Sequence, residues 1–339
     1  MTTKVQPLDR KSAIAQPGLH RRILLPLVWI ALLAVMPFLL NSFFIGVASS
    51  VLIWVIIGIG VMVLLGYSGQ VSIGHAAFLA MGAYGEALLI QNSVPFPLSL
   101  VIVALCTLVI GVAVGLPSLR FSGLYLAMAT LAFAFIVEAV IGGIEMTGGR
   151  GGMSVDDATI FGHSLSNDLP MFYTALVIAA LVFWLANNLV GSRTGRAWQA
   201  IRDSEIAATS MGISIARYKT IAFAFSASVT AVAGTLLAHK VGYLSPDGFT
   251  IQQSIEMLIL VVVGGLGSLM GAIYGALFIV LLPVLLSLIK DQLPPAIAEL
   301  PGLEAGVFGL SLMLVILFQP GGINSAVTRL LALIGGRTQ

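Results

Sequence analysis

The sequence has little of what an enzyme or a metalloprotein needs. Its 339 residues contain one cysteine, Cys106, and only 9% are charged. A single cysteine cannot form a disulfide within the chain or supply the thiolates of a structural zinc site. None of the lysines lies in a G-x-x-x-x-G-K-[ST] motif, so the chain lacks the Walker-type loop that cradles nucleotide phosphates. We therefore predict no catalytic residues, no metal site, no cofactor bound by this chain and no enzymatic activity.

Apolar residues are abundant instead, at 58% of the chain. They form runs of about 20 residues, each long enough to cross a bilayer. The fold class that this predicts is an all-α polytopic membrane protein with about ten transmembrane helices. The first run lacks an A-x-A cleavage site, so we interpret it as a retained span and not as a signal peptide. The predicted spans lie near residues 23–40, 43–65, 74–91, 97–116, 122–144, 170–190, 220–238, 251–268, 270–289 and 304–319.

Lysine and arginine are distributed unevenly between the loops. If both termini lie inside, only Arg150, Lys240 and Lys290 fall outside the cytoplasm, as the positive-inside rule requires. We therefore predict an N-in/C-in topology for a membrane protein that contacts lipid and no nucleic acid. Its predicted parts are a cytoplasmic basic arm at 1–22, a membrane domain at 23–320 with an external loop at 145–169 and a cytoplasmic segment at 191–219, and a cytoplasmic tail at 321–339. The external loop either docks a soluble partner or is a flexible connection.

A first glycine-rich break interrupts the apolar pattern at 66–75, GYSGQVSIGH. Broken helices at membrane depth are tolerated where protein or a water-filled cavity satisfies the freed backbone. The break is either part of a substrate path or a tight turn at the cytoplasmic surface. Its G-x-S-G pattern also leaves open an intramembrane serine hydrolase, with Ser68 as nucleophile and His239 as its partner. The polar pore-proximal candidates are Tyr67, Ser68, Gln70, Ser72 and His75, with Thr130 from a later span.

A second glycine-rich break lies near 264–271. The spacing of Gly267, Gly271 and Gly275 predicts one helix face of small residues, which lets neighbouring helices approach closely. With Gly264 and Gly265, these glycines are candidates for helix packing or for a gate.

Three acidic residues fall within predicted spans, where a charge is costly and often functional. Glu138 is the most deeply embedded, whereas Glu86 and Glu256 lie near span ends and could reach the interface. We include Glu138 and Glu256 among the pore-proximal candidates. A stand-alone secondary carrier coupled to protons remains an alternative, although such a carrier would be expected to have a longer relay of acids.

The one long polar stretch between apolar spans is SRTGRAWQAIRDSEIAATSMGISIARYK, at 192–219. We interpret it as a basic, helix-forming platform, which suits a membrane protein driven by a separate motor. Ser204 can cap a helix that begins at Glu205, and Gly212 permits a left-handed stop. The arginines around it could instead bind anionic lipid headgroups.

Five motifs in order resemble the permease subunits of branched-chain amino acid ABC importers, and the LivM-type half more than its LivH-type partner. They are GYSGQVSIGHAAFLAMGAY at 66–84, LRFSGLYLAMATLAFAF at 119–135, TGGRGGM at 147–153, SRTGRAWQAIRDSEIAATSMGI at 192–213 and SIEMLILVVVGGLGSLMGAIYGA at 254–276. The resemblance implies a bacterial inner (plasma) membrane importer for branched-chain or similar hydrophobic amino acids. Related permeases also serve urea and short amides.

The same resemblance implies partners. They are a second, LivH-type permease, two cytoplasmic ATPase subunits that carry ATP and Mg, and a periplasmic substrate-binding protein. It also implies that the ATPase docks on residues 204–212. The docking residues it implies are Arg202, Glu205, Ala207, Ala208, Met211 and Gly212.

Overall fold

The structure, a computed structural model, describes residues 37, 41–116, 123–160, 162–290, 303–319 and 321–334. The fold below is that of the described residues from Ser42 onward, which belong to one compact unit. The predicted basic arm and almost all of the predicted span at 23–40 lie outside the described residues. The helices are α2 (Ser42–Val61), η2 (Met62–Tyr67), α3 (His75–Gln91), α4 (Phe96–Gly115), α5 (Leu124–Gly143), η4 (Glu145–Thr147), η5 (Gly149–Gly151), α6 (Asp168–Gly191), α7 (Arg193–Asp203), α8 (Glu205–Ser210), α9 (Ile215–Val241), η6 (Pro246–Gly248), α10 (Ile251–Gly264), α11 (Leu269–Lys290), α13 (Leu303–Phe318) and α14 (Gly322–Ile334).

Each predicted span after the first coincides with a helix of this set. Within the described residues, seven helical segments are long and apolar enough to cross a membrane. They are 42–67, 96–115, 124–143, 168–191, 215–241, 246–264 and 269–290. Helices α3 and α13 have 17 and 16 residues, so they are shorter than each of these seven segments. The chain is thus an all-α, multi-pass membrane protein, while the count of ten spans and the N-in/C-in topology stay predictions.

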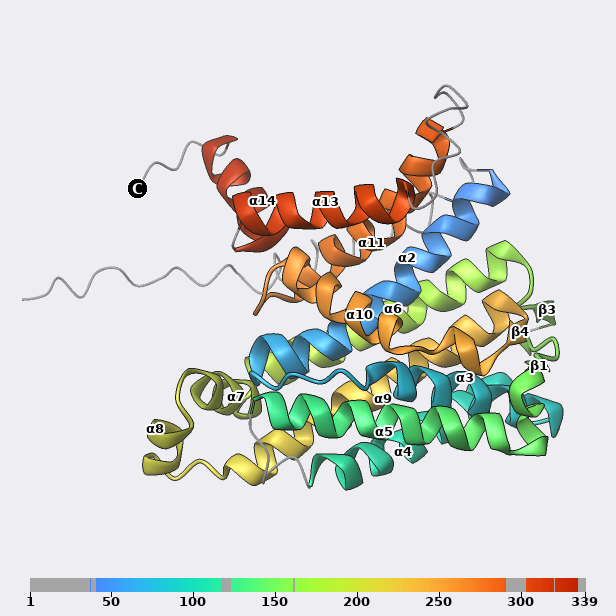
Figure 1. The fold of residues 1–339 in the computed structure, drawn as a ribbon, viewed down its shortest axis with the longest axis horizontal. Helices are drawn as coiled ribbons and strands as arrows, with labels where there is room; N and C mark the ends of the chain where they lie inside the picture. Colours follow the sequence, from blue (N-terminus) through green and yellow to red (C-terminus); the bar gives the residue numbers. More distant parts are fainter. Residues whose placement is uncertain are drawn as a thin grey trace, which may run out of the picture. The chain divides into compact units, whose positions relative to one another are not determined.

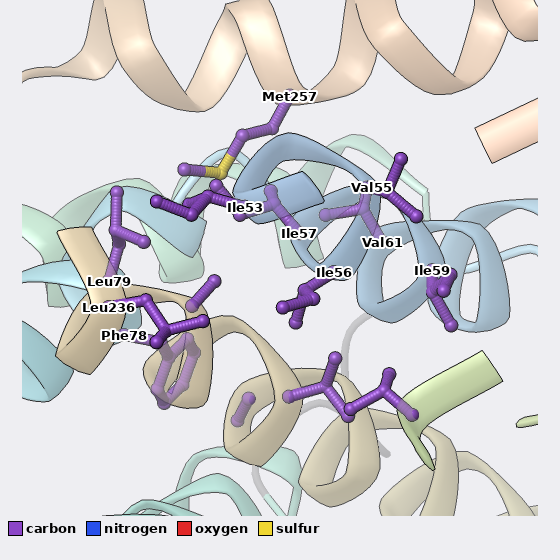
Figure 2. Close-up of a cluster of buried hydrophobic side chains, with 14 of the residues drawn as sticks. Ile53, Val55, Ile56, Ile57, Ile59, Val61, Phe78, Leu79, Leu236 and Met257 are labelled. Carbon is purple, nitrogen blue, oxygen red and sulfur yellow. The ribbon is translucent and has the colours of Figure 1, made fainter. Parts of the chain in front are cut away.

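The helices differ in how deeply they are buried. In the most apolar stretch of α9, 78% of the residues are buried, and 67% in that of α2 and η2. Figure 2 shows Ile53, Ile56 and Ile57 of α2 near Phe78, Leu79, Leu236 and Met257, which come from α3, α9 and α10. In the most apolar stretches of α4 and α5, only 28% of the residues are buried. Because helix α2 is apolar on every side, it suits this central position.

Helices α3 and α9 cross at very short distance. A Cβ atom added to Gly82 of α3 would overlap the Ala231 carbonyl oxygen of α9. A Cβ atom on Gly234 of α9 would overlap the Leu79 carbonyl oxygen of α3. The two backbones therefore touch through glycine on both sides of the crossing, as small residues allow between membrane helices.

The predicted external loop at 145–169 is folded. Strand β1 (Met153–Ser154) pairs antiparallel with β4 (Tyr243–Leu244), which directly follows α9, and β2 (Thr159–Ile160) pairs with β3 (His163–Ser164). Hydrogen bonds from Ser164 and Ser166 lower the pKa of Asp157 in this loop. Figure 1 shows these strands at one end of the helices and α7 and α8 at the other. The loop is thus a small cap joined to the end of α9.

The region around the second break differs from the prediction in two ways. Gly267 does not share a helix face with Gly271 and Gly275, because α11 begins only at Leu269 and Gly267 has a left-handed φ of 83°. The predicted tail also contains a helix, α14, whose first residue Gly322 packs closely on Gly265.

Candidate functional site

The first glycine-rich break begins with a turn of π-helix, η2. The backbone N–H of Ser68 donates to the carbonyl oxygen of Val63, and the N–H of Gly69 to that of Leu65. Gly69 then takes a left-handed φ of 71°. Such π-helical turns occur often at functional sites, where they interrupt the regular hydrogen-bond ladder.

Side chains of the break are buried and bonded within the protein. Ser68 donates to the Leu64 carbonyl oxygen at 2.7 Å. Gln70 Nε2 donates to Ser68 Oγ at 2.9 Å and to the Lys219 carbonyl oxygen at 3.1 Å. The break is therefore tied to the first turn of α9. Tyr67 lies at the end of η2 and is also buried.

The residues that lead from this turn into α3 are bonded to three further helices. His75 Nδ1 lies 2.9 Å from Ser72 Oγ, and its Nε2 lies 2.8 Å from Ser226 Oγ on α9. Thr130 Oγ1 of α5 accepts from the Ile73 backbone N–H at 3.1 Å. The backbone N–H that follows His75 donates to a serine of α10 at 2.9 Å. Most polar side chains of the break are thereby bonded within the protein, as broken helices in a membrane require, although Gln70 Oε1 is buried with no hydrogen-bond partner among the described residues. Whether these residues line a path stays a prediction.

The geometry does not support a serine hydrolase. Ser68 bonds to Leu64 and Gln70, whereas both ring nitrogens of His75 are directed to other serines. His239 is near the far end of α9 from Lys219, about 30 Å away along a helix of this pitch. The hypothesis that pairs Ser68 with His239 is therefore wrong, because the two side chains lie at opposite ends of α9.

Glu86 is a fully buried acid on α3. Its side chain does not reach the protein surface, since the residue is 0% exposed. Its Oε1 accepts from Ser99 of α4 at 2.8 Å and lies 3.1 Å from His239 Nε2 of α9. This acid therefore joins α3, α4 and α9 where they pack together. By contrast, the partly buried Glu138 lines a small cavity between α5, α3 and η6.

Glu256 is also only partly buried, and its Oε1 accepts from Gln252 Nε2 at 3.4 Å, one turn earlier on α10. The two residues form a weak polar pair on this helix. A role for Glu138 or Glu256 beside a path stays a prediction.

The second break separates α10 from α11, and its glycines allow these helices to touch. A Cβ atom on Gly264 would overlap the Gly271 carbonyl oxygen, and one on Gly275 would overlap that of Leu260. Gly265 has a φ of 112°. The break also meets the first one, because a Cβ atom on Gly66 would lie 2.9 Å from the Gly267 backbone nitrogen.

Helices α7 and α8 form a platform at the end of the helices opposite the strands (Figure 1). We call residues Arg193–Ser210 the platform. Trp198 is fully buried, and its Nε1 donates to the Tyr218 carbonyl oxygen at 2.8 Å, which fixes α7 against α9. Ser204 caps α8 by accepting from the Ala207 N–H at 3.2 Å. Gly212 follows with a φ of 78°, so the predicted N-cap of α8 at Ser204 and the left-handed end at Gly212 are both confirmed.

The exposed surface of α8 is more apolar than the sequence motif suggested. Ile206 is 83% exposed and Met211 is 68% exposed. Ala208 is 0% exposed, so in this structure it packs the platform itself and offers no surface to a partner. Glu205 Oε1 accepts from Lys219 Nζ at 2.6 Å, and the lysine is buried. Arg202 turns toward the first break, where its Nη1 donates to the Gly66 carbonyl oxygen.

The profile of the family described as "Branched-chain amino acid transport system / permease component" matches residues 43–317. The chain belongs to this permease family. The matched residues include both breaks, the folded external loop at 145–169 and the platform.

Curated relatives agree with the family profile. The chain is 34% identical over 258 residues to the high-affinity branched-chain amino acid transport system permease protein LivM of Salmonella typhimurium, and equally to that of Escherichia coli. Each alignment covers 68% of this permease and 61% of the relative, so the chain spans less than two thirds of their length. A probable LivM of Methanocaldococcus jannaschii is 24% identical over 231 residues, covering 67% of each chain. No solved structure matches this permease.

Two structural features of this region were not predicted from the sequence. Ile206 was not among the docking candidates, although a large apolar residue between Glu205 and two alanines on a polar stretch is a usable signal for a contact surface. The Glu86–His239 pair joins residues 153 positions apart, and nothing in either local pattern indicates the other.

Proposed function

We propose that this chain is the permease subunit of an ATP-driven importer for branched-chain or similar hydrophobic amino acids in the bacterial inner membrane. Separate ATPase subunits, which bind ATP and Mg, dock on residues 204–212. A second related permease completes the translocation path, and a periplasmic binding protein delivers the substrate. The names of the LivM relatives support the substrate class.

The observation that carries this proposal is the exposed apolar surface of α8. Ile206 lies on a short capped helix at the end of the membrane helices, and Met211 is the C-cap residue of that helix, so both are outside any apolar span. Exposed large apolar side chains on such a segment favour a protein partner. Because this platform is anchored by Trp198 and by the Glu205–Lys219 pair, a partner could move it as a unit.

Reconstitution tests the proposal. The chain is placed in proteoliposomes with the ATPase subunits, second permease and binding protein that co-purify with it. We expect leucine uptake that requires ATP and the binding protein. Uptake by the chain alone, driven by a proton gradient, would contradict the proposal in favour of a secondary carrier. Competition by urea or short amides for the binding protein would shift the substrate class within the same family.

The docking surface predicts a specific loss of ATPase binding. Replacing Ile206 and Met211 together by Asp removes the large apolar contacts of the surface, and truncation of a residue that dominates an interface costs about 2 kcal/mol or more. We expect the affinity for the ATPase subunits to fall more than about tenfold. Co-purification and titration with the ATPase subunits in detergent measure this affinity. The matched control is Gln199→Asp on the exposed side of α7, and equal affinity of both variants would refute the surface.

The Glu205–Lys219 pair predicts a different effect. Glu205→Lys places a second cation beside a buried lysine, in place of the carboxylate that now lies 2.6 Å from it. We expect α8 to detach from α9 and ATP-driven uptake to be lost, while the protein stays in the membrane. Glu205→Gln is the control, since it keeps a hydrogen-bond acceptor and adds no like charge. Normal leucine uptake by Glu205→Lys would show that the pair has no part in coupling.

A further inference from the structure

Arg202 contacts both glycine-rich breaks from the last turn of α7. Its Nη1 donates to the Gly66 carbonyl oxygen in the π-helical turn. Its stem lies against the first break as well, because a Cβ atom on Gly69 would be 3.0 Å from Arg202 Cγ and 3.4 Å from its Cα. A Cβ atom on Gly267, in the second break, would be 3.0 Å from Arg202 Nη1.

The two breaks are suited to act as hinges. Each contains glycines with left-handed φ angles, namely Gly69, Gly265 and Gly267, and the first includes the π-helical turn. Segments of this kind absorb backbone changes when domains move. Since Gly66 and Gly267 are themselves in close contact, a displacement at one break reaches the other.

Arginine suits a link of this kind. Its guanidinium is planar and presents several donors in a rigid fork, which lets it bond a backbone carbonyl oxygen with a defined geometry. The platform is also joined to the first break by a second route. Lys219 bonds Glu205 of α8 with its side chain and Gln70 of the break with its carbonyl oxygen.

We propose that Arg202 is a positioning residue that links the platform to both breaks and transmits platform movement to them. The inference rests on the proposed function, since it needs an ATPase that moves α8. It assigns Arg202 an inward role, distinct from the docking contact that its motif implied.

The first experiment compares Arg202→Lys with Arg196→Lys in proteoliposomes that contain the complete importer. Arg196 lies on the same helix, is exposed, and donates to the Gly191 carbonyl oxygen at 3.3 Å, away from the breaks. For Arg202→Lys we expect normal ATPase retention and ATP hydrolysis, but leucine transported per ATP reduced at least about fivefold, as for a typical coupling between two sites. Arg196→Lys should keep the wild-type ratio.

The outcomes separate the two proposals. If the wild-type chain retains no ATPase subunits, the proposed function fails. If the wild type transports leucine and Arg202→Lys does so with an unchanged ratio, the proposed function stands and this inference is overturned.

A second experiment tests the link without relying on one arginine variant. A Cβ atom on Gly69 would lie 3.5 Å from Arg202 Cβ, which is within the range that a disulfide spans. We therefore combine Gly69→Cys and Arg202→Cys in a Cys106→Ser background. The reduced protein should be uncoupled, and oxidation should restore most of the leucine-to-ATP ratio because a covalent link replaces the arginine. The same leucine-to-ATP ratio in the reduced and the oxidised protein would contradict the inference.

Discussion

Replacing Gly82 by Ala is expected to destabilise the protein by about 3 kcal/mol, because overpacking by even one methyl group forces a closely packed core apart. The added Cβ atom would overlap the Ala231 carbonyl oxygen, which belongs to the backbone of α9 and cannot rotate away. The overlap can be removed only if α3 and α9 move apart at their crossing, where a glycine on each helix allows the two backbones to touch. We expect a clearly lower apparent Tm in detergent and less protein in the membrane.

The same helix offers a matched control. Gly85 lies one turn further along α3, and a Cβ atom there would meet Val103 at 3.4 Å, an ordinary contact. Gly85→Ala should therefore be neutral or slightly stabilising, since alanine favours a helix by about 1 kcal/mol over glycine. If the thermal melts of the two variants coincide, the close crossing of α3 and α9 is refuted.

The second large effect is expected for Glu86→Ala. The carboxylate is fully buried and bonds both Ser99 and His239. Its removal leaves the imidazole of His239 without this acceptor, and loss of one partner from a buried pair costs about 3 kcal/mol or more. We expect a lower apparent Tm and weaker packing of α4 against α3 and α9.

Glu86→Gln separates charge from hydrogen bonding. The amide oxygen can still accept from Ser99 and His239, so we expect a loss of about 1 kcal/mol. Thermal unfolding of both variants in the same detergent provides the measurement. An alanine variant as stable as wild type would mean that the pair contributes nothing to folding, whereas equal losses for both variants would assign its contribution to charge.

Local features of this fold were predictable from the sequence because their causes are local. Apolar length defines the membrane helices after the first, and glycine with polar neighbours defines the two breaks. Ser204 and Gly212 act within four residues of the backbone groups that they affect, so the ends of α8 could be assigned from the sequence.

Features that depend on which helix faces which were not predictable. Helices that are apolar on every side carry no periodic signal of their buried face, so the partners of Glu86 on α3 could not be inferred. Helix α8 has only six residues, too few to show a periodic pattern, so the burial of Ala208 could not be inferred either. Gly267 was placed on a helix because its spacing from Gly271 fits one, yet the chain turns there with a left-handed φ. Arg202 is an exposed residue of the platform, and the sequence carries no signal that its guanidinium bonds Gly66.

Helix α9 runs without proline from the platform at Ile215 to the folded cap at Val241. Its 27 residues make a rod of about 40 Å at the normal helical rise. Its first end is fixed to α7 by Trp198, and its other end continues into β4, which pairs with the cap. A tilt of about 5° about one end would displace the other by about 3.5 Å over that length. If an ATPase docks on the platform as proposed, a small rotation of α9 at that end would become a movement of several ångströms at the folded external loop, with no hinge needed between the two ends.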